Sequence, residues 1–278
     1  MAQPLIPSTA YADAWIQVDQ TENPRFFVNL LDATRARLLE RARKSPVQFF
    51  APLALRAGLN VLDVGCGTGD FLRLLAPLVS PGKAVGLDLS ETMIAEAVQR
   101  STENAANLSF RVGSALELPF QAETFDRVLA TQVLLHLPDP WKALAEMKRV
   151  LAPSGLICIS EIDWGTLVVQ TSDNELGRRF SDLACRELRN GLIIRELPGE
   201  LRKLGFNHIV ILPEVEVAQE RDTLYTWFVE PSLKHFKRIG AFSEAEAEAF
   251  LADLNERADR GSYFSSRTYY TILASQSS

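Results

Sequence analysis

The chain has 278 residues, of which 47% are hydrophobic and 23% charged, and it carries a formal net charge of −6. This composition is typical of a globular protein and provides enough apolar residues for one large domain with insertions. The net negative charge disfavours nucleic acid as a ligand, because binding a polyanion depends on clustered Lys and Arg side chains.

Cys66, Cys158 and Cys185 lie far apart in the sequence and show no CxxC spacing. We therefore expect neither a disulfide framework nor a metal site, and we predict a cytoplasmic location. No positive charge precedes Arg25, and no apolar run approaches the about 20 residues that cross a bilayer. These features predict neither a signal peptide nor a membrane span.

The first predicted element is a helix that begins after Asn23 and Pro24, a pair typical of an N-cap and first turn, and ends before Pro46. The most basic stretch of the chain, Arg35 to Lys44, lies within this helix. We interpret it as a solvated helix face, because Glu40 interrupts its positive charge.

From Leu59 onward, short apolar runs alternate with amphipathic segments. Alternation of this kind predicts an α/β fold with a parallel sheet covered by helices on both faces. The predicted strands are residues 60–65, 84–90, 108–113, 125–130 and 155–161.

Two long intervals interrupt this pattern. The first follows Glu161 and precedes a predicted helix at 195–206 and strand at 207–212; the second runs from Pro213 to Ser266, before a final predicted strand at 267–274. Within the second interval, Ser243 and Glu246 have the spacing of a capping box. We divide the chain into an N-terminal helical lid segment (1–58), a core (59–162), a cap insertion (163–195) and a C-terminal part of the core (196–278) with a helical insertion at about 214–266.

A glycine-rich turn follows the first predicted strand. The segment VLDVGCGTGDF places Gly65, Gly67 and Gly69 between a strand and a helix, where a backbone without Cβ can approach a ligand. Asp70 stands where a pyrophosphate-binding GxGxxG motif has its last small residue, and its charge would repel a pyrophosphate. S-adenosylmethionine (SAM) has no phosphate and carries positive groups, so it suits this turn better than NAD does.

Asp88 ends the next predicted strand, 19 residues after Gly69. A carboxylate in this position can accept hydrogen bonds from both hydroxyls of a ribose. The glycine turn and Asp88 together therefore predict a site for a nucleoside cofactor.

Five segments resemble, in order and spacing, the motifs of class I SAM-dependent methyltransferases of the ubiquinone/menaquinone-biosynthesis-like group. They are VLDVGCGTGDF, VGLDLS, RVGSALELPF, FDRVLATQVLLHLPD and EMKRVLAPSGLICISE, and the resemblance covers Leu59 to Trp164. It implies a Rossmann-like seven-stranded sheet whose last strand is antiparallel, helical cap insertions, and SAM as the cofactor.

By this resemblance, Asp63 and the glycine turn hold the methionyl end of SAM, Asp88 holds the ribose, and Met93 packs near the adenine. Ser114 stands where the family commonly has an Asp that contacts the adenine amino group, and its hydroxyl can still accept that bond. The cofactor-binding residues expected as a set are Asp63, Gly65, Cys66, Gly67, Thr68, Gly69, Asp88, Leu89, Met93, Ser114, Ala115, Thr131 and Gln132.

His136 is the candidate catalytic residue, because it follows the fourth predicted strand at the edge where the cofactor is expected. It could act as a general base, or it could shape the pocket as a neutral hydrogen-bonding residue. Glu161 and Asp163 end the fifth strand and could orient a substrate or be structural. His208 and His235 are interpreted as structural.

Aromatic residues are frequent outside the predicted strands. They pack between lid helices or line an apolar acceptor pocket. They are Tyr11, Trp15, Phe26, Phe27, Tyr225, Trp227, Phe228 and Phe236.

We predict a SAM-dependent methyltransferase that acts on a small organic molecule, in specialised or quinone-like metabolism. A homodimer is left open. The alternatives are a cyclase or other pericyclic catalyst that keeps SAM without methyl transfer, a protein or nucleic-acid methyltransferase, and an NAD-dependent dehydrogenase. The acidic composition disfavours a nucleic-acid methyltransferase, and Asp70 disfavours the dehydrogenase.

Overall fold

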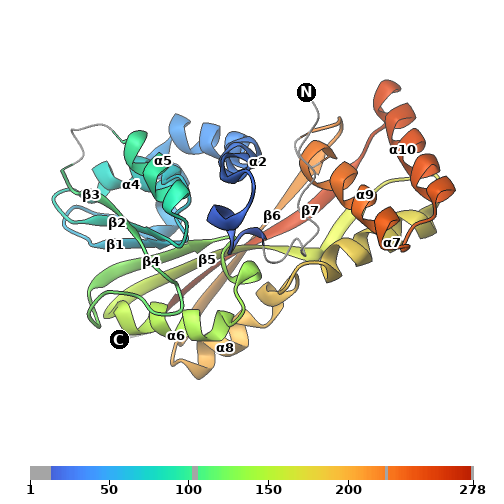
Figure 1. The fold of residues 1–278 in the computed structure, drawn as a ribbon. Coiled ribbons are helices and arrows are strands. Elements are labelled where there is room, and N and C mark those ends of the chain that lie inside the picture. Colours follow the sequence, from blue (N-terminus) through green and yellow to red (C-terminus); the bar gives the residue numbers. More distant parts are fainter. Residues whose placement is uncertain (1–13, 102–105, 223–224, 277–278) are drawn as a thin grey trace.

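The computed structural model describes residues 14–101, 106–222 and 225–276. Its centre is a seven-stranded sheet with the order β3-β2-β1-β4-β5-β7-β6, in which β1 to β5 are parallel and β7 is antiparallel to both of its neighbours (Figure 1). The strands are β1 (Val61–Val64), β2 (Ala84–Asp88), β3 (Leu108–Val112), β4 (Phe125–Thr131), β5 (Leu151–Val169), β6 (His208–Ala218) and β7 (Ser265–Ser275). The predicted Rossmann-like sheet with an antiparallel last strand is confirmed.

Helices cover both faces of the sheet. Figure 1 shows α2, α4 and α5 over one face and α6 and α8 over the other, with α7, α9 and α10 gathered near the far ends of β5, β6 and β7. The α-helices are α2 (Pro24–Lys44), α3 (Pro46–Phe49), α4 (Asp70–Val79), α5 (Glu91–Gln99), α6 (Pro140–Val150), α7 (Asn174–Arg186), α8 (Leu197–Lys203), α9 (Glu230–Arg238) and α10 (Glu244–Asp259). The short turns are 3₁₀ helices η1 (Val18–Gln20), η2 (Ala51–Leu53), η3 (Leu134–His136) and η4 (Ile193–Arg195), and a π turn, η5 (Tyr225–Val229). Among the described residues, no helix is long and apolar enough to span a membrane.

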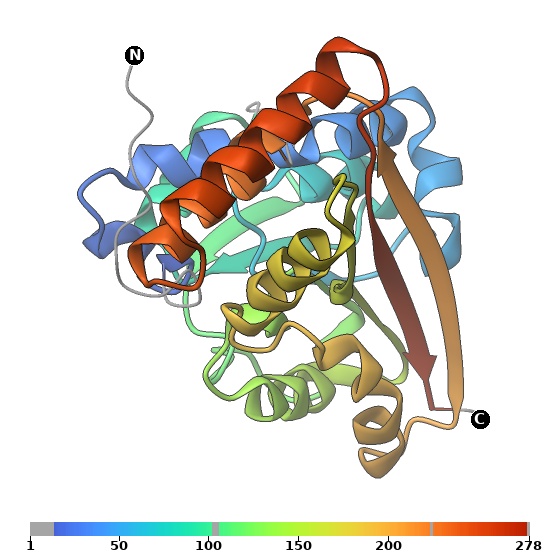
Figure 2. The same cartoon turned by 90° about the vertical axis from the view of Figure 1, so that its right-hand side faces the viewer.

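Two strands are longer than the sequence predicts. β5 continues past Glu161 to Val169, and β6 continues past Pro213 to Ala218, where it still pairs with β7. The β5–β7 pairing is irregular between Asp163 and Val168. Figure 2 shows the long β6 and β7 strands running side by side. The extension of β5 forms part of the candidate site described below.

The predicted helix ends are confirmed at two places. Pro24 is the first residue of α2 and Asn23 is its N-cap residue, although the Asn23 side chain makes no capping hydrogen bond. Ser243 and Glu246 form the capping box of α10, with both reciprocal hydrogen bonds present. The sequence identifies these ends because they depend on residues adjacent in the chain.

Helix α2 packs on the core through a stripe in which residues recur every fourth position. Phe27, Leu31, Arg35 and Leu39 all lie on this stripe and are buried. The prediction that the basic stretch from Arg35 onward is a solvated face is therefore wrong at Arg35. It holds for the more exposed cations, including Arg37 and Arg41.

Two ion-pair contacts fix α2 against α5. Arg100 donates to both carboxylate oxygens of Asp32, at 2.7 and 2.8 Å, and Arg25 pairs with Glu96 at 2.8 Å. A bidentate Arg–carboxylate pair is geometrically specific. In this structure α2 is therefore an integral part of the wall that faces the glycine turn.

Candidate active site

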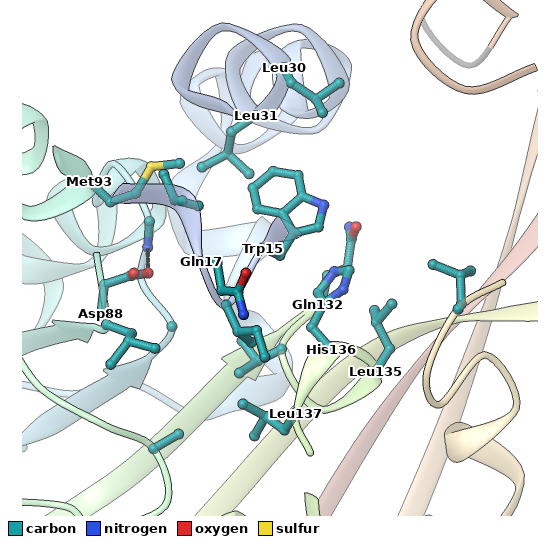
Figure 3. A pocket seen from close by; sticks show the side chains of 18 of the residues that line it. Trp15, Gln17, Leu30, Leu31, Asp88, Met93, Gln132, Leu135, His136 and Leu137 are labelled. Atoms are coloured by element: carbon teal, nitrogen blue, oxygen red, sulfur yellow. Dashed lines mark hydrogen bonds between the residues drawn. The ribbon is translucent and has the colours of Figure 1, made fainter. Parts of the chain in front are cut away.

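A cavity of about 420 Å³ lies at the carboxyl ends of the parallel strands. Its wall combines residues from the loops after β1, β2, β3 and β4 with residues from α2, from the segment around η1, and from β5 and β7. In Figure 3, Asp88 and Met93 lie on one side and Leu135 on the other, with Trp15, Gln132 and His136 between them. Parallel α/β sheets bind ligands at this edge, so this cavity is the candidate active site.

The glycine turn has the backbone conformation that its sequence predicts. Gly65, Gly67 and Gly69 have φ values of 69°, 54° and 72°, which are costly for residues with a Cβ. A Cβ on Gly67 would also lie 2.6 Å from Cδ2 of Leu31 in α2. A larger residue at position 67 would therefore disturb the packing of α2 as well as the approach of a ligand.

Asp88 is held at the cavity wall by two backbone N–H groups. Its Oδ2 accepts from the N–H of Gly67 at 2.8 Å, and its Oδ1 accepts from the N–H of Ser90 at 3.0 Å. Burial raises the pKa of the Asp88 carboxyl, while these two hydrogen bonds and the charge of Arg35 oppose the rise. A carboxylate has about four acceptor positions, so each oxygen can still accept a ligand hydroxyl.

The structure brings most of the predicted cofactor residues to the cavity. Those that line it are Gly65, Gly67, Asp88, Leu89, Met93, Ser114, Ala115 and Gln132. The others, Asp63, Cys66, Thr68, Gly69 and Thr131, are not part of the lining. Asp63, Cys66 and Thr68 are buried in or next to the turn.

Ser114 and Gln132 are the lining residues with distinctive local conformations. The Ser114 hydroxyl accepts from the N–H of Leu116 at 3.1 Å, which fixes the loop after β3. Gln132 has a φ of 56°, a left-handed conformation that is uncommon outside glycine and often occurs at functional sites.

Asp70 does not line the cavity. Its carboxylate accepts from the Thr68 hydroxyl at 2.7 Å and is ion-paired with Arg73. The sequence argument against NAD therefore rested on a charge that is paired beside the loop. The glycine turn and Asp88 still favour a nucleoside cofactor.

Arg35 is a site residue that the sequence interpretation missed. It is 5% exposed and lines the cavity; its Nη2 donates to the carbonyl of Thr131 at 3.3 Å, and its Nε has no hydrogen-bond partner among the described residues. An unpartnered N–H on a buried cation is costly unless a ligand satisfies it. The site therefore fits a ligand with a carboxylate, as SAM has. The detectable signal was an Arg in register with the apolar stripe of α2.

His136 belongs to η3 and lines the cavity, where its ring centroid lies 5.7 Å from that of Trp15. Its Nδ1 is buried without a hydrogen-bond partner in the described part of the chain. Burial lowers the pKa of His136 to about 3. The imidazole is therefore neutral at physiological pH.

Glu161 is fully buried beneath the turn that carries His136. Its Oε1 accepts from the N–H groups of Val133 and Leu134, at 2.9 and 2.8 Å, while its Oε2 has no partner among the residues described. Burial raises the pKa of Glu161 to about 8. This carboxyl group links the end of β5 to the start of η3.

The other polar candidates are engaged in contacts within the protein. Asp163 forms a bidentate ion pair with Arg195, at 2.8 and 2.9 Å. His235 contacts Glu187 at 3.0 Å, and His208 lies at the start of β6 with an exposed side chain. The contact of His235 is consistent with a structural role, and neither histidine lines the cavity.

The aromatic residues named from the sequence divide between cavity and core. Trp15 and Phe228 line the cavity, whereas Phe26, Phe27, Tyr225 and Phe236 are buried. Tyr11 and the side chain of Trp227 lie outside what the structure describes. Trp164, at the end of the predicted motif region, also lines the cavity and packs on Phe228 with a centroid distance of 4.4 Å.

The strand order, the glycine turn after β1 and the carboxylate at the end of β2 define an α/β domain whose site fits a nucleoside cofactor. A family model for a methyltransferase domain matches residues 55–207, which is more than half of the chain. The chain therefore belongs to the class I SAM-dependent methyltransferase family.

Two relatives show the extent of the sequence similarity. An uncharacterized 37.1 kDa protein in transposon Tn4556 of Streptomyces fradiae is 35% identical over 227 residues, which cover 80% of this chain and 64% of the relative. The demethylmenaquinone methyltransferase of Staphylococcus aureus is 40% identical over 118 residues, which cover 42% of this chain and 48% of that enzyme. The chain thus matches less than two thirds of the length of each relative.

Solved structures show the same fold at low sequence identity. The YcgJ protein of Bacillus subtilis is 18% identical with a TM-score of 0.57, and the match covers 83% of this chain and 97% of that one. A putative methyltransferase of Bacillus halodurans C-125 is 17% identical with a TM-score of 0.58, covering 84% of this chain and 100% of that one. These similarities support the fold.

Proposed function

We propose that the chain transfers a methyl group from SAM to a small organic molecule. The observation that carries this proposal is that one cavity is bordered both by the cofactor residues, such as Asp88 and Gly67, and by an apolar group that includes Trp164 and Phe228. A cofactor and an acceptor could therefore meet inside one enclosure.

The residues of this cavity suit the parts of SAM. Asp88 would hold the ribose, Arg35 the carboxylate, and Met93 and Ser114 the adenine. When bound, SAM supplies an electrophilic methyl group on its sulfonium. The glycine turn would leave room for the methionyl end, with Asp63 buried behind it.

The protein has only to align the acceptor with the methyl group and to exclude water. His136 is a weak base, since burial lowers its pKa to about 3, and we assign it a role as a neutral residue that positions the acceptor. Glu161 would hold the η3 turn, and with it His136, in place.

Two observations favour a small acceptor over a macromolecule. The lining of the cavity is dominated by apolar side chains, and the chain carries a net charge of −6. The similarity to a demethylmenaquinone methyltransferase supports a role in quinone-like or specialised metabolism, and the match covers 42% of this chain.

Methyl-labelled SAM and a panel of small phenols, quinols, acids and amines test this proposal. We expect label in one or more acceptors and an equal amount of S-adenosylhomocysteine (SAH). A SAM-dependent product of unchanged mass would instead indicate a cyclase or other pericyclic catalyst. Failure of the purified chain to bind SAM or SAH in calorimetry would contradict the proposal.

A further inference from the structure

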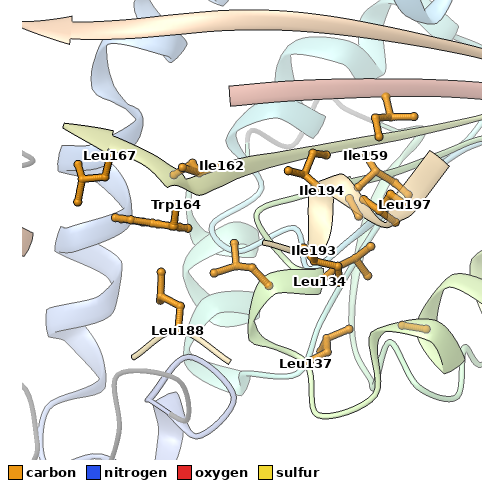
Figure 4. Close-up of a cluster of buried hydrophobic side chains, with 14 of the residues drawn as sticks. Leu134, Leu137, Ile159, Ile162, Trp164, Leu167, Leu188, Ile193, Ile194 and Leu197 are labelled. Carbon is orange, nitrogen blue, oxygen red and sulfur yellow. The ribbon is translucent and has the colours of Figure 1, made fainter. Parts of the chain in front are cut away.

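One end of the cavity has the composition of a specific acceptor site. We call it the acceptor end, and it consists of Ile162, Trp164, Leu188, Phe228, Arg267 and Tyr269. Figure 4 shows Ile162, Trp164 and Leu188 in the apolar cluster around β5. Five of the six side chains present an aliphatic or aromatic surface, and the sixth, Arg267, is charged.

Strand β7 places Arg267 and Tyr269 together. Residues two apart in a strand face the same side, so both side chains point toward the cavity face of β7. The guanidinium group of Arg267 lies 5.4 Å from the centroid of the Tyr269 ring and 5.8 Å from that of Trp164. The cation is thus enclosed between two aromatic rings.

Arg267 keeps its charge in a buried position beside the Glu216 carboxylate and the Tyr269 hydroxyl. The residue is 7% exposed and pairs across the strands with Glu216 on β6. Both its Nε and its Nη2 contact the same oxygen, Oε2 of Glu216, at 2.7 Å. A guanidinium has five N–H groups, so this single oxygen uses only part of its donor capacity.

The other polar groups at the acceptor end are also donors. The Trp164 indole can only donate, and its Nε1 is buried without a hydrogen-bond partner in the described part of the chain. Burial raises the pKa of the Tyr269 phenol to about 12, so its hydroxyl stays protonated, and it interacts with both Glu216 and Arg267. The nearby carboxylate Asp163 is engaged by Arg195.

Hydrogen-bond donors that lie between aromatic and aliphatic side chains favour a flat ligand with an anionic oxygen. A ring stacks well on Trp164 and Phe228, and an anionic oxygen forms a short, strong hydrogen bond with a guanidinium. A cationic group would be repelled by Arg267 and would find no acceptor on Trp164. An apolar acceptor would leave the donors unsatisfied, which is costly in a buried site.

We propose that the methyl acceptor is a planar conjugated molecule that carries an anionic oxygen, either a carboxylate or a phenolate, and that Arg267 binds this oxygen. The inference rests on the proposed function, because it names the substrate class of the same cavity. Arg267 is a specificity-determining residue in this assignment, and Glu216 limits the affinity by neutralising part of its charge.

Matched probes test this assignment on the SAH-saturated protein by calorimetry. 2-Naphthoate and 2-naphthamide differ in charge but little in shape, and 4-nitrophenolate and 4-nitroanisole form a second such pair. We expect at least one anion to bind about tenfold more tightly than its neutral partner, which corresponds to about 1.4 kcal/mol. Which pair shows the preference distinguishes a carboxylate from a phenolate.

Two variants assign the preference to Arg267. Arg267→Gln should reduce the ratio of anion to neutral affinity to about one, while SAH affinity changes by less than about threefold. Glu216→Gln keeps the guanidinium and removes its counter-charge, so it should strengthen binding of the anion. A purely structural role for the pair predicts weaker binding in both variants.

Equal affinities for the anionic and neutral probes in the unmodified protein would overturn the assignment, as would weaker anion binding by Glu216→Gln. If SAH binds normally in those experiments, only the acceptor class is wrong and the proposed methyl transfer stands. If SAH does not bind the unmodified protein, the proposed function itself fails.

Discussion

At the scale of single residues, cofactor binding depends on groups whose geometry is set before any ligand arrives. Asp88 is the clearest case, because the N–H groups of Gly67 and Ser90 already fix its carboxylate at the cavity wall. A carboxylate held in this way loses less conformational entropy on binding a ligand than a flexible side chain would.

Asp88→Ala should therefore weaken SAM and SAH binding by about 2 kcal/mol, because the ribose hydroxyls lose a charge-assisted partner. Calorimetry on the two proteins measures the difference. Glu91→Ala is the matched control, since Glu91 is a nearby exposed carboxylate on α5 that does not line the cavity. Equal losses in both variants would mean that general charge, and not a ribose contact, determines the affinity.

Asp63 predicts a pH dependence of cofactor binding. Burial raises the pKa of Asp63 to about 7, against the opposing charge of Arg35, so the group is partly protonated at neutral pH. The ammonium group of SAM favours the ionised form, which exists above that pKa. SAM affinity should accordingly rise between about pH 6 and pH 8.

Asp63→Asn is the test of this pH dependence, because the amide has a similar shape and does not titrate. Calorimetry across the pH range should give a flatter affinity profile for the variant than for the unmodified protein. An unchanged slope in the variant would assign the titration to another group.

The sequence predicted Asp88 and the glycine turn because their chemistry depends on neighbours in the chain. It did not identify Arg35 or Arg267, whose roles depend on what packs against them. Arg35 lies on the buried stripe of α2, and Arg267 faces Glu216 across two strands. In the sequence, the only sign of Arg35 and Arg267 is that each is a charged residue within an otherwise apolar pattern.

At the scale of elements, the connection between β5 and η3 determines where His136 lies. Glu161 accepts two N–H groups at the start of η3, which would otherwise be unsatisfied at the N-terminus of a short helix. The group is fully buried, and burial raises its pKa to about 8. The protonated form is thus favoured in the folded protein.

This raised pKa has a defined effect on stability. Because the folded-state pKa lies above the usual value of 4.5, the contribution of Glu161 is fully present below about pH 4.5 and is lost as the pH rises through about 8. Glu161→Gln should reduce that loss, which is on the order of a few kcal/mol. Chemical denaturation at several pH values measures it, and Asp63→Asn accounts for the separate contribution of Asp63. A variant with an unchanged pH slope would show that Glu161 does not titrate in this range.

The ends of helices and strands could be predicted from the sequence only where neighbouring residues, such as a capping box or a proline, mark them. The capping box at Ser243 and the proline at the start of α2 mark helix ends directly. The extension of β5 beyond Glu161 has no such signal, since it is stabilised by pairing with β7, more than ninety residues later. Long-range pairing of this kind cannot be read from a short window of sequence.

At the scale of the whole molecule, the chain encloses its cavity from three directions. The sheet edge provides the floor, α2 covers the glycine turn, and the extended β5 and β7 strands bring the acceptor end beside it. The ion pairs of α2 with α5 make that helix a fixed wall in this structure. We therefore propose that, of the N-terminal lid segment predicted from the sequence (1–58), only the part before α2 acts as a lid.

Residues 14–23 are the described part of that segment, and residues within it contact both halves of the cavity. Asp19 accepts from the Ser90 hydroxyl at 2.8 Å and from the N–H groups of Glu91 and Thr92, at 2.7 and 3.1 Å, beside the cofactor end. Trp15 lines the cavity near His136. One short segment thus covers the place where methyl transfer is proposed.

The Trp15→Ala variant tests whether this segment covers the reaction site without contributing to cofactor binding. We expect SAH affinity to stay within about threefold of the unmodified protein, while turnover with any accepted substrate falls roughly tenfold, because the acceptor is less well aligned and more exposed to water. Removing residues 1–20 also removes Asp19, so it should weaken SAH binding in addition. Hydrogen exchange should show stronger protection of Ile16 to Gln20 when SAH and an acceptor are both bound. Normal turnover by Trp15→Ala, or exchange in this segment that ignores both ligands, would show that the fixed wall of α2 and the acceptor end enclose the reaction without it.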